Sequence, residues 1–155
     1  MEDLSRSAPF FELLRDSYAR LVGSPLLEAE AGRDATWLYR DAPFAVLAHN
    51  TEPDPRFIYA NRTAQRCFEY SWDELVRLQS RLSAEEPDRA ERQRLLDAVA
   101  SRGFVTGYAG LRIAKSGRRF WIRDGVIWQL IDERGVTHGQ AAIFRSWRDA
   151  DTLGA

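Results

Sequence analysis

The sequence of 155 residues has one cysteine, one lysine and two histidines, and it has no long hydrophobic run. Because Cys67 stands alone, an internal disulfide is excluded, which is compatible with a reducing compartment. No stretch approaches the roughly 18 apolar residues that a membrane-spanning helix needs, and the acidic start Met1-Glu2-Asp3 is unlike a secretion signal. We therefore expect a soluble, cytoplasmic protein that does not contact a membrane.

The sequence also has no excess of charge of one sign. The formal net charge is -1, with acidic and basic residues interspersed, so no broad positive field is present to hold a phosphate backbone. The histidines His49 and His138 and the lone Cys67 do not show the paired spacing of a zinc site. The sequence thus predicts neither nucleic-acid binding nor a metal site, and its length suits a single domain with its own core.

The clearest pattern that is present is a series of strands in the last third of the chain. Three apolar runs, at 104–114, 118–131 and 136–144, are separated by short polar breaks that contain Gly117 and Gly135. Glycine takes the positive φ that tight hairpins require. This order predicts a three-stranded antiparallel meander, and the runs at 44–49 and 57–60 predict two further strands, giving a five-stranded sheet.

An amphipathic helix precedes these strands. Phe11, Leu14, Tyr18 and Leu21 recur at helical spacing, and the sequence Gly23-Ser24-Pro25 ends the helix. Its apolar stripe packs either on the domain's own sheet or against a second copy in a homodimer. We divide the chain into an N-terminal helical extension and linker at 1–39, the domain at 40–146 and a C-terminal tail at 147–155.

The middle of the chain predicts helices. Asn61 is a good N-cap, and Ser71 with Glu74 forms a capping box. A longer helix is expected from Asp88 to Arg102, ending at Gly103. We expect a buried stripe at Leu95, Leu96 and Val99, and a solvated face made of Arg89, Glu91, Arg92 and Arg94.

Several short motifs follow in a fixed order between residues 10 and 144. They are Ala48-His49-Asn50-Thr51-Glu52-Pro53-Asp54-Pro55, Tyr59-Ala60-Asn61, Trp72, Ser80-Arg81-Leu82-Ser83-Ala84-Glu85, Glu91-Arg92-Gln93-Arg94-Leu95-Leu96, Gly107-Tyr108-Ala109-Gly110-Leu111-Arg112-Ile113, Gly117-Arg118-Arg119-Phe120, Trp128 and Gly139-Gln140-Ala141-Ala142. As an ordered set they resemble the MEKHLA family, which is PAS-like. The resemblance implies an α+β fold with helices on one face of an antiparallel sheet. It also implies a sensory or regulatory role, here in the stand-alone bacterial form.

The PAS-like resemblance suggests two cofactors, flavin and haem. The residues of this sequence disfavour a photoactive flavin and haem. A photoactive flavin domain needs a cysteine facing the ring, whereas Ser80 stands at that place and we expect Cys67 to be an ordinary buried residue. Haem-binding members place an axial histidine, often on the long helix, and residues 88–102 contain none. The ligand therefore stays an unidentified small molecule in a cavity between sheet and helices.

Eight residues are candidates for the wall of this cavity: His49, Asn61, Ser80, Arg81, Tyr108, Arg112, Trp128 and Gln140. Some have structural alternatives. Asn61 is chiefly a helix cap, Arg81 forms a salt bridge with Glu85 or Glu86, and Trp128 belongs to the core. Gln140 stands among small residues, which leaves space for its amide to orient a ligand.

Two further questions stay open in the sequence. We expect one face of the strand to carry Phe120, Ile122, Val126, Trp128 and Leu130. Asp124 either shares this face, with Arg112 as its partner, or is turned out to solvent by a bulge at Asp124-Gly125. His49 and Ser80 would suit a small enzyme only if they lie within hydrogen-bond reach in a pocket. Our main hypothesis is a non-enzymatic sensory module with a separate protein partner, and its alternative is a ligand-free interaction or dimerisation module.

Overall fold

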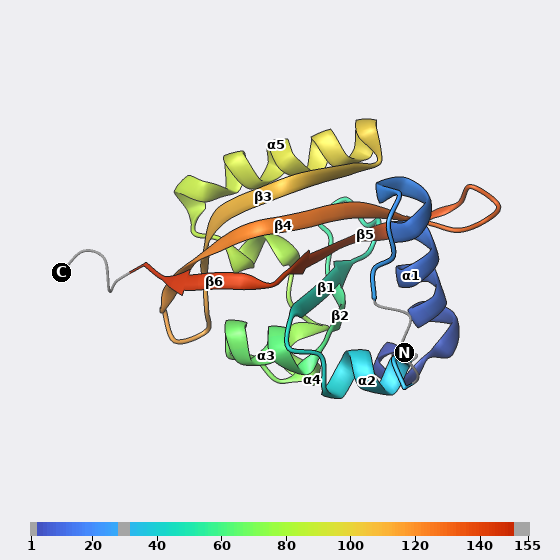
Figure 1. Cartoon of the computed structure of the whole chain (residues 1–155). Coiled ribbons are helices and arrows are strands. Elements are labelled where there is room, and N and C mark those ends of the chain that lie inside the picture. The colour runs from blue at the N-terminus through green and yellow to red at the C-terminus, as the bar shows by residue number, and fades with distance from the viewer. Residues whose placement is uncertain (1–2, 28–31, 151–155) are drawn as a thin grey trace.

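The computed structural model describes residues 3–27 and 32–150, which are built around a six-stranded antiparallel sheet (Figure 1). The order is β2-β1-β5-β4-β3, and β6 also pairs with β4. The strands are β1 Ala45–His49, β2 Phe57–Ala60, β3 Phe104–Ile113, β4 Arg119–Ile131, β5 Thr137–Phe144 and β6 Ser146–Asp149. The predicted α+β class and the meander are confirmed, and β6 is a strand that we did not expect.

One face of the sheet is covered by helices from the middle of the chain, which are α3 Arg62–Phe68, α4 Trp72–Leu75, the 3-10 helix η2 Ser80–Ser83 and α5 Glu86–Arg102. The Ser71–Glu74 capping box is present, and Asn61 caps α3. Helix α5 begins two residues before the predicted Asp88, because Pro87 suits a first turn in which its missing N–H is not needed. It ends at Gly103, whose φ is 93°.

The other face is covered by the N-terminal segment, which consists of η1 Leu4–Arg6, α1 Ala8–Val22 and α2 Ala35–Arg40. Helix α1 lies against β4, with Leu14 fully buried. The Trp128 indole Nε1 donates a hydrogen bond of 2.9 Å to Ser17 Oγ. The apolar stripe of α1 therefore packs on the sheet of its own chain.

Strand β1 shows the result of covering both faces. Ala45 and Leu47 join one apolar cluster, and Val46 and Ala48 join the other. All five residues of β1 are buried. This explains why β1 reads as a continuous apolar run and not as an alternating one.

A bulge in β4 changes which face its side chains reach. Asp124 is exposed with a φ of 51°, and the pairing with β3 shifts beside Gly125. Before the bulge, Phe120 and Ile122 face the α5 side, and after it Trp128 and Leu130 face α1. The bulge is thus confirmed, and the expectation of one face for Phe120, Ile122, Val126, Trp128 and Leu130 is wrong, since the extra residue reverses the alternation.

The proposed division of the chain at residues 39 and 146 stays a prediction. Contacts of α1 with β4 cross the first boundary, and the pairing of β6 with β4 crosses the second. Within residues 3–27 and 32–150, the structure contains no helix long and apolar enough to cross a membrane.

Candidate functional site

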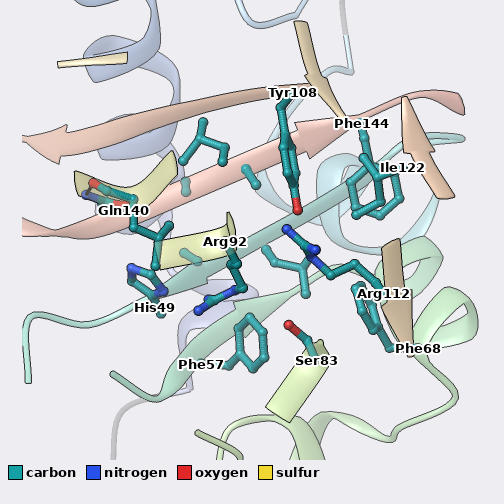
Figure 2. Close-up of a pocket in the computed structure, with 16 residues that line it drawn as sticks. His49, Phe57, Phe68, Ser83, Arg92, Tyr108, Arg112, Ile122, Gln140 and Phe144 are labelled. Carbon is teal, nitrogen blue, oxygen red and sulfur yellow. Dashed lines mark hydrogen bonds between the residues drawn. The ribbon is translucent and has the colours of Figure 1, made fainter. Parts of the chain in front are cut away.

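A pocket lies between the sheet and the helices of the α5 side (Figure 2). Its cavity volume is about 60 Å³, inside a wider hollow of about 510 Å³ that includes open solvent. Most of its wall is apolar. The lining residues are Leu47, Ala48, His49, Phe57, Phe68, Ser83, Arg92, Leu96, Tyr108, Arg112, Ile122, Ile127, Gln140, Ala141, Ala142 and Phe144.

Strand β3 supplies two polar groups of this wall. Its alternation places Tyr108, Gly110 and Arg112 on the buried face. The Arg112 side chain folds back over Gly110. A Cβ atom added to Gly110 would lie only 2.9 Å from both Nη1 and Nη2 of Arg112. Figure 2 shows the Tyr108 hydroxyl pointing towards this guanidinium group. Gly110 therefore provides the space in which the Arg112 head rests.

Arg112 is incompletely satisfied, although only 2% of it is exposed. Its Nη1 donates a 2.6 Å hydrogen bond to the Leu111 carbonyl oxygen and lies 3.9 Å from Glu91 Oε2, whose side chain is 41% exposed. Arg112 Nη2 and Gln140 Oε1 are the buried side-chain polar atoms of the described residues that have no partner. Buried polar groups are nearly always paired, so both atoms call for a ligand or water.

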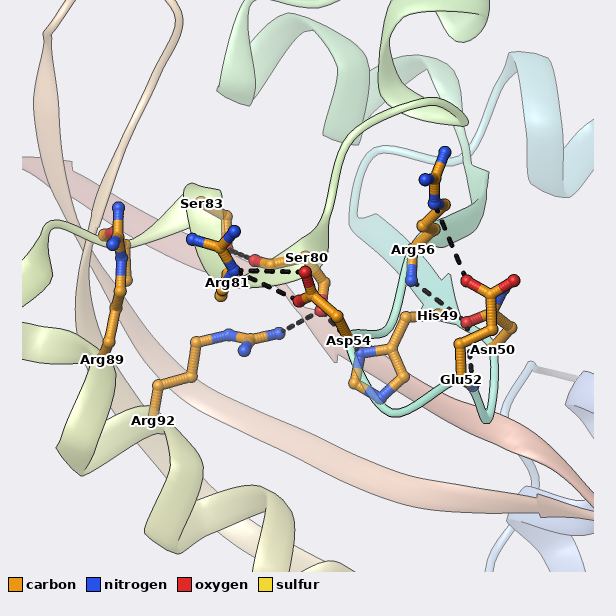
Figure 3. A network of polar contacts seen from close by, with 11 residues as sticks. His49, Asn50, Glu52, Asp54, Arg56, Ser80, Arg81, Ser83, Arg89 and Arg92 are labelled. Atoms are coloured by element: carbon orange, nitrogen blue, oxygen red, sulfur yellow. Dashed lines mark hydrogen bonds and ion pairs between the residues drawn. The ribbon is translucent and has the colours of Figure 1, made fainter.

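A second polar group of the wall is a network around Ser80 (Figure 3). Arg92 Nη2 donates a hydrogen bond of 2.9 Å to Ser80 Oγ, and His49 Nδ1 lies 3.1 Å from the same oxygen. Since Ser80 accepts from Arg92, its own proton is free to be donated to His49 Nδ1. Ser80 thus positions one side chain from β1 and one from α5.

Burial sets the protonation states in this network. Burial, and then the nearby charge of Arg92, lower the pKa of His49 to about 3, so the imidazole is neutral at neutral pH. Burial also lowers the pKa of Arg92 to about 10, which leaves the guanidinium charged. The network therefore contributes one neutral ring and one cation to the pocket.

The contact of 3.1 Å between His49 and Ser80 meets the distance that we required for an enzyme, but Ser80 does not open into the pocket as we also required. Ser80 is 0% exposed and is not among the lining residues, so its hydroxyl is not presented to a substrate. Among the described residues, no carboxylate hydrogen-bonds to His49 to orient it. The arrangement fits positioning better than covalent catalysis.

Four of the eight predicted residues line the pocket together, namely His49, Tyr108, Arg112 and Gln140. Ser80 lies directly behind them through its bond to His49. Gln140 Nε2 donates a hydrogen bond of 3.1 Å to the Leu96 carbonyl oxygen, which fixes its amide next to α5.

The other three predicted residues lie elsewhere. Asn61 is fully buried, and its Nδ2 donates to the carbonyls of Leu38 and Phe44 while its Oδ1 caps α3. Arg81 is about half exposed and pairs with Asp54 at 3.2 Å, not with Glu85 or Glu86. Trp128 faces α1 because it follows the β4 bulge. Placing Asn61, Arg81 and Trp128 in the pocket wall was therefore wrong.

Arg92 is the charged pocket residue that we missed, since we assigned it to a solvated face. It precedes Leu95, Leu96 and Val99 by three, four and seven positions, which places all four on one side of the helix. That spacing was the available signal. The usual exposure of arginine outweighed it in our interpretation.

The flavin and haem expectations concern specific residues. Cys67 lies buried on α3, where burial raises the pKa of its thiol to about 12, and it is not a lining residue of the pocket. The sequence has no other cysteine, so the residues do not fit a photoactive flavin adduct. Helix α5 carries no histidine for haem, and the described residues contain no cluster of metal-ligating side chains.

No curated protein matches the chain. Among solved structures, it is similar to a PAS domain of a protein from Colwellia psychrerythraea, with 18% identity and a TM-score of 0.63 over 76% of this chain and 94% of that one. At such identity the likeness shows the fold alone.

Two light-oxygen-voltage domains are also similar. One, from a blue-light activated histidine kinase of Erythrobacter litoralis, has 22% identity and a TM-score of 0.56 over 70% of this chain and 97% of that one. The other, studied with a flavin analogue, has 18% identity and a TM-score of 0.58 over 72% and 82%. Finally, a sequence model of the MEKHLA domain matches residues 8–149. Because this match spans most of the chain, the protein belongs to the MEKHLA domain family, and its fold is PAS-like.

Proposed function

We propose that this protein is a non-enzymatic sensory module, which binds a small molecule in the pocket and signals through protein-protein contacts. The observation that carries the proposal is the pair of buried atoms without partners, Arg112 Nη2 and Gln140 Oε1, both in the pocket wall. An unsatisfied buried polar group costs about 1–3 kcal/mol, which a bound ligand would offset.

The construction of the pocket supports a sensory role. His49 comes from β1, Arg112 from β3, Gln140 from β5 and Arg92 from α5, so a ligand would touch elements that are far apart in the chain. Binding could then shift α5 relative to the sheet. We assign the output to a separate protein partner in the cytoplasm. A homodimer stays a prediction, although the apolar stripe of α1 packs on the sheet of its own chain.

Native mass spectrometry of the purified protein tests this function. Ala142 lines the pocket and pairs with Leu47 and Ile127, so Ala142→Leu should fill the space. We expect a bound small molecule, or uptake of one from a host metabolite extract, in the wild type and in the control Ala109→Leu, whose position on β3 is exposed. Ala142→Leu should lose it.

The same experiment addresses flavin. The light-oxygen-voltage neighbours make flavin a stronger candidate than the sequence alone suggests, and bound flavin would be seen by its mass and its visible absorbance. A protein that stays free of any small molecule, before and after incubation with the extract, would contradict the ligand-binding function.

One observation favours the alternative of a ligand-free interaction module. Trp121 is 39% exposed on β4, on the part of the strand before the bulge, and its cross-strand neighbours are Leu111 and Arg148. Exposed tryptophan is enriched in protein interfaces. Under this alternative, Trp121→Ser abolishes partner capture while Ala142→Leu leaves it unchanged.

A further inference from the structure

We propose that the ligand is a small organic monoanion, a carboxylate attached to an apolar body, whose carboxylate lies at Arg92 and Arg112. This inference rests on the proposed function and names the class of molecule that the pocket takes. It follows from three features of the wall, which are its charge balance, its free donors and its apolar surface.

The charge balance of the buried wall is positive. Arg112 is almost fully buried, and its nearest carboxylate is that of Glu91, at 3.9 Å. Arg92 is partly buried, and its hydrogen bond goes to the uncharged Ser80 hydroxyl. Two cations thus face one half-exposed carboxylate, while the neutral His49 adds no charge. Because a buried charge without a partner is costly, the site is short of one negative charge.

The free donors favour a carboxylate as that charge. A guanidinium group presents its N–H donors in a planar fork that matches the two oxygens of a carboxylate. Arg112 Nη2 has no hydrogen-bond partner within distance among the described residues, although the Tyr108 hydroxyl points towards the same guanidinium group in Figure 2 and interacts with it. A phosphate would bring about two negative charges, which is more than the site lacks.

The remaining wall residues indicate that the body of the ligand is apolar. Phe57, Phe68, Ile122 and Phe144 surround the arginines with apolar surface, which suits an aromatic ring or a short aliphatic chain. The unpaired oxygen Gln140 Oε1 would accept a hydrogen bond from a hydroxyl or N–H group of a substituted ligand.

A surface groove lies beside the pocket. It shares His49, Leu96 and Gln140 with the pocket wall. The hydrogen bond from Gln140 Nε2 to the Leu96 carbonyl oxygen lies among these shared residues, at 3.1 Å. A ligand entering from the groove would therefore pass the Gln140 amide before it reaches Arg112.

Isothermal titration with two sets of three probes, each set of similar size, tests the charge of the ligand. The probes are phenylacetate, phenylacetamide and phenethylamine, and hexanoate, hexanamide and hexylamine form an aliphatic set. We expect saturable binding of at least one carboxylate, with at least tenfold weaker binding of its amide and none of its amine. Equal binding of the amide, or preference for inorganic phosphate, would overturn the inference.

Variants locate the binding site. Arg112→Met should weaken carboxylate binding at least tenfold while the empty protein keeps or raises its melting temperature, since an unpaired buried charge is removed. Gly110→Ala should also weaken binding, because the new Cβ would displace the Arg112 head. The control Arg81→Met removes an exposed arginine that pairs with Asp54 and should bind as the wild type does. Unchanged affinity in both Arg112→Met and Gly110→Ala would refute the assignment.

The two proposals fail in different ways. If native mass spectrometry shows a bound molecule that is uncharged or cationic, the carboxylate inference is wrong and the sensory function stands. If neither the extract nor any probe binds, both fail together.

Discussion

Ser80 is a small residue whose single hydroxyl serves two pocket side chains, His49 Nδ1 and Arg92 Nη2. Ser80→Ala would leave both short of a partner in a buried place. We expect the free energy of unfolding to fall by about 1–3 kcal/mol in urea denaturation. The control Ser101→Ala lies on the exposed part of α5 and should change it by less than about 0.5 kcal/mol. Equal effects of the two variants would show that the Ser80 network is not stabilising.

His49 predicts a dependence of stability on pH. Its pKa is about 3 in the folded state, against the ordinary histidine value of 6.5 in the unfolded chain. The unfolded chain therefore binds more protons, and stability that is fully present above about pH 6.5 is lost as the pH falls towards 3. At about pH 5.5 the loss from this residue should be about 1.4 kcal/mol.

Urea denaturation at about pH 7.5 and 5.5 measures this loss. The higher of these two pH values lies above the titration of His49, and both lie above that of Glu69, Glu74 and Asp132, whose pKa values are lowered by hydrogen bonds. His49→Gln should abolish most of the loss, whereas His138→Asn should keep it. A loss that follows His138 in place of His49 would contradict the assignment.

At the scale of elements, α1 is part of the core. Leu14 is 0% exposed and belongs to the cluster that contains Val46, Trp128 and Leu130. Leu14→Ala should lower the free energy of unfolding by about 3–5 kcal/mol, because it removes buried methyl groups and leaves a cavity. The half-buried Leu13 offers a control, since Leu13→Ala should cost clearly less. A loss below about 1 kcal/mol for Leu14→Ala would mean that the domain folds without this helix.

Sequence reasoning succeeded for elements whose signals are local. Turns with Gly117 and Gly135, the Ser71 capping box and the Gly103 helix end each depend on neighbouring residues only, and the structure contains all of them. The start of α5 was misjudged by two residues, because Asp88 looked like a cap although Pro87 already lies in the first turn. Strand β6 was missed, since its four residues pair with a strand that is distant in the chain.

The pocket shows where such reasoning stops. His49, Tyr108, Arg112 and Gln140 lie in the pocket wall where the sequence placed them, and their contact with a ligand stays a prediction. Trp128 does not lie there, because a single bulge residue sends every later side chain of β4 to the other face. Which face receives a ligand depends on the helices packed there, and this is a tertiary property. The unpaired state of Arg112 Nη2 likewise follows only from what surrounds it in space.

At the scale of the whole molecule, the two faces of the sheet should respond differently to a ligand. Helix α5 has only Val99 fully buried, so its local opening should cost less free energy than opening of the central strands. A carboxylate held by Arg92 and Arg112 binds only while α5 is closed on β3. At a concentration of about 100 times Kd, it should oppose opening by about 2.7 kcal/mol, which slows exchange about 100-fold.

Hydrogen exchange with and without the carboxylate that titration selects measures this response. We expect slower amide exchange in α5 and in the part of β3 around Arg112, and little change in α1, which lies on the opposite face. Arg112→Met serves as the control, because it should exchange alike in both conditions. Equal slowing in α1 and α5 would indicate global stabilisation without a local response. Slowing confined to the α5 side would show that occupancy of the pocket is transmitted to the helix that covers it, which is the first step that a sensory module requires.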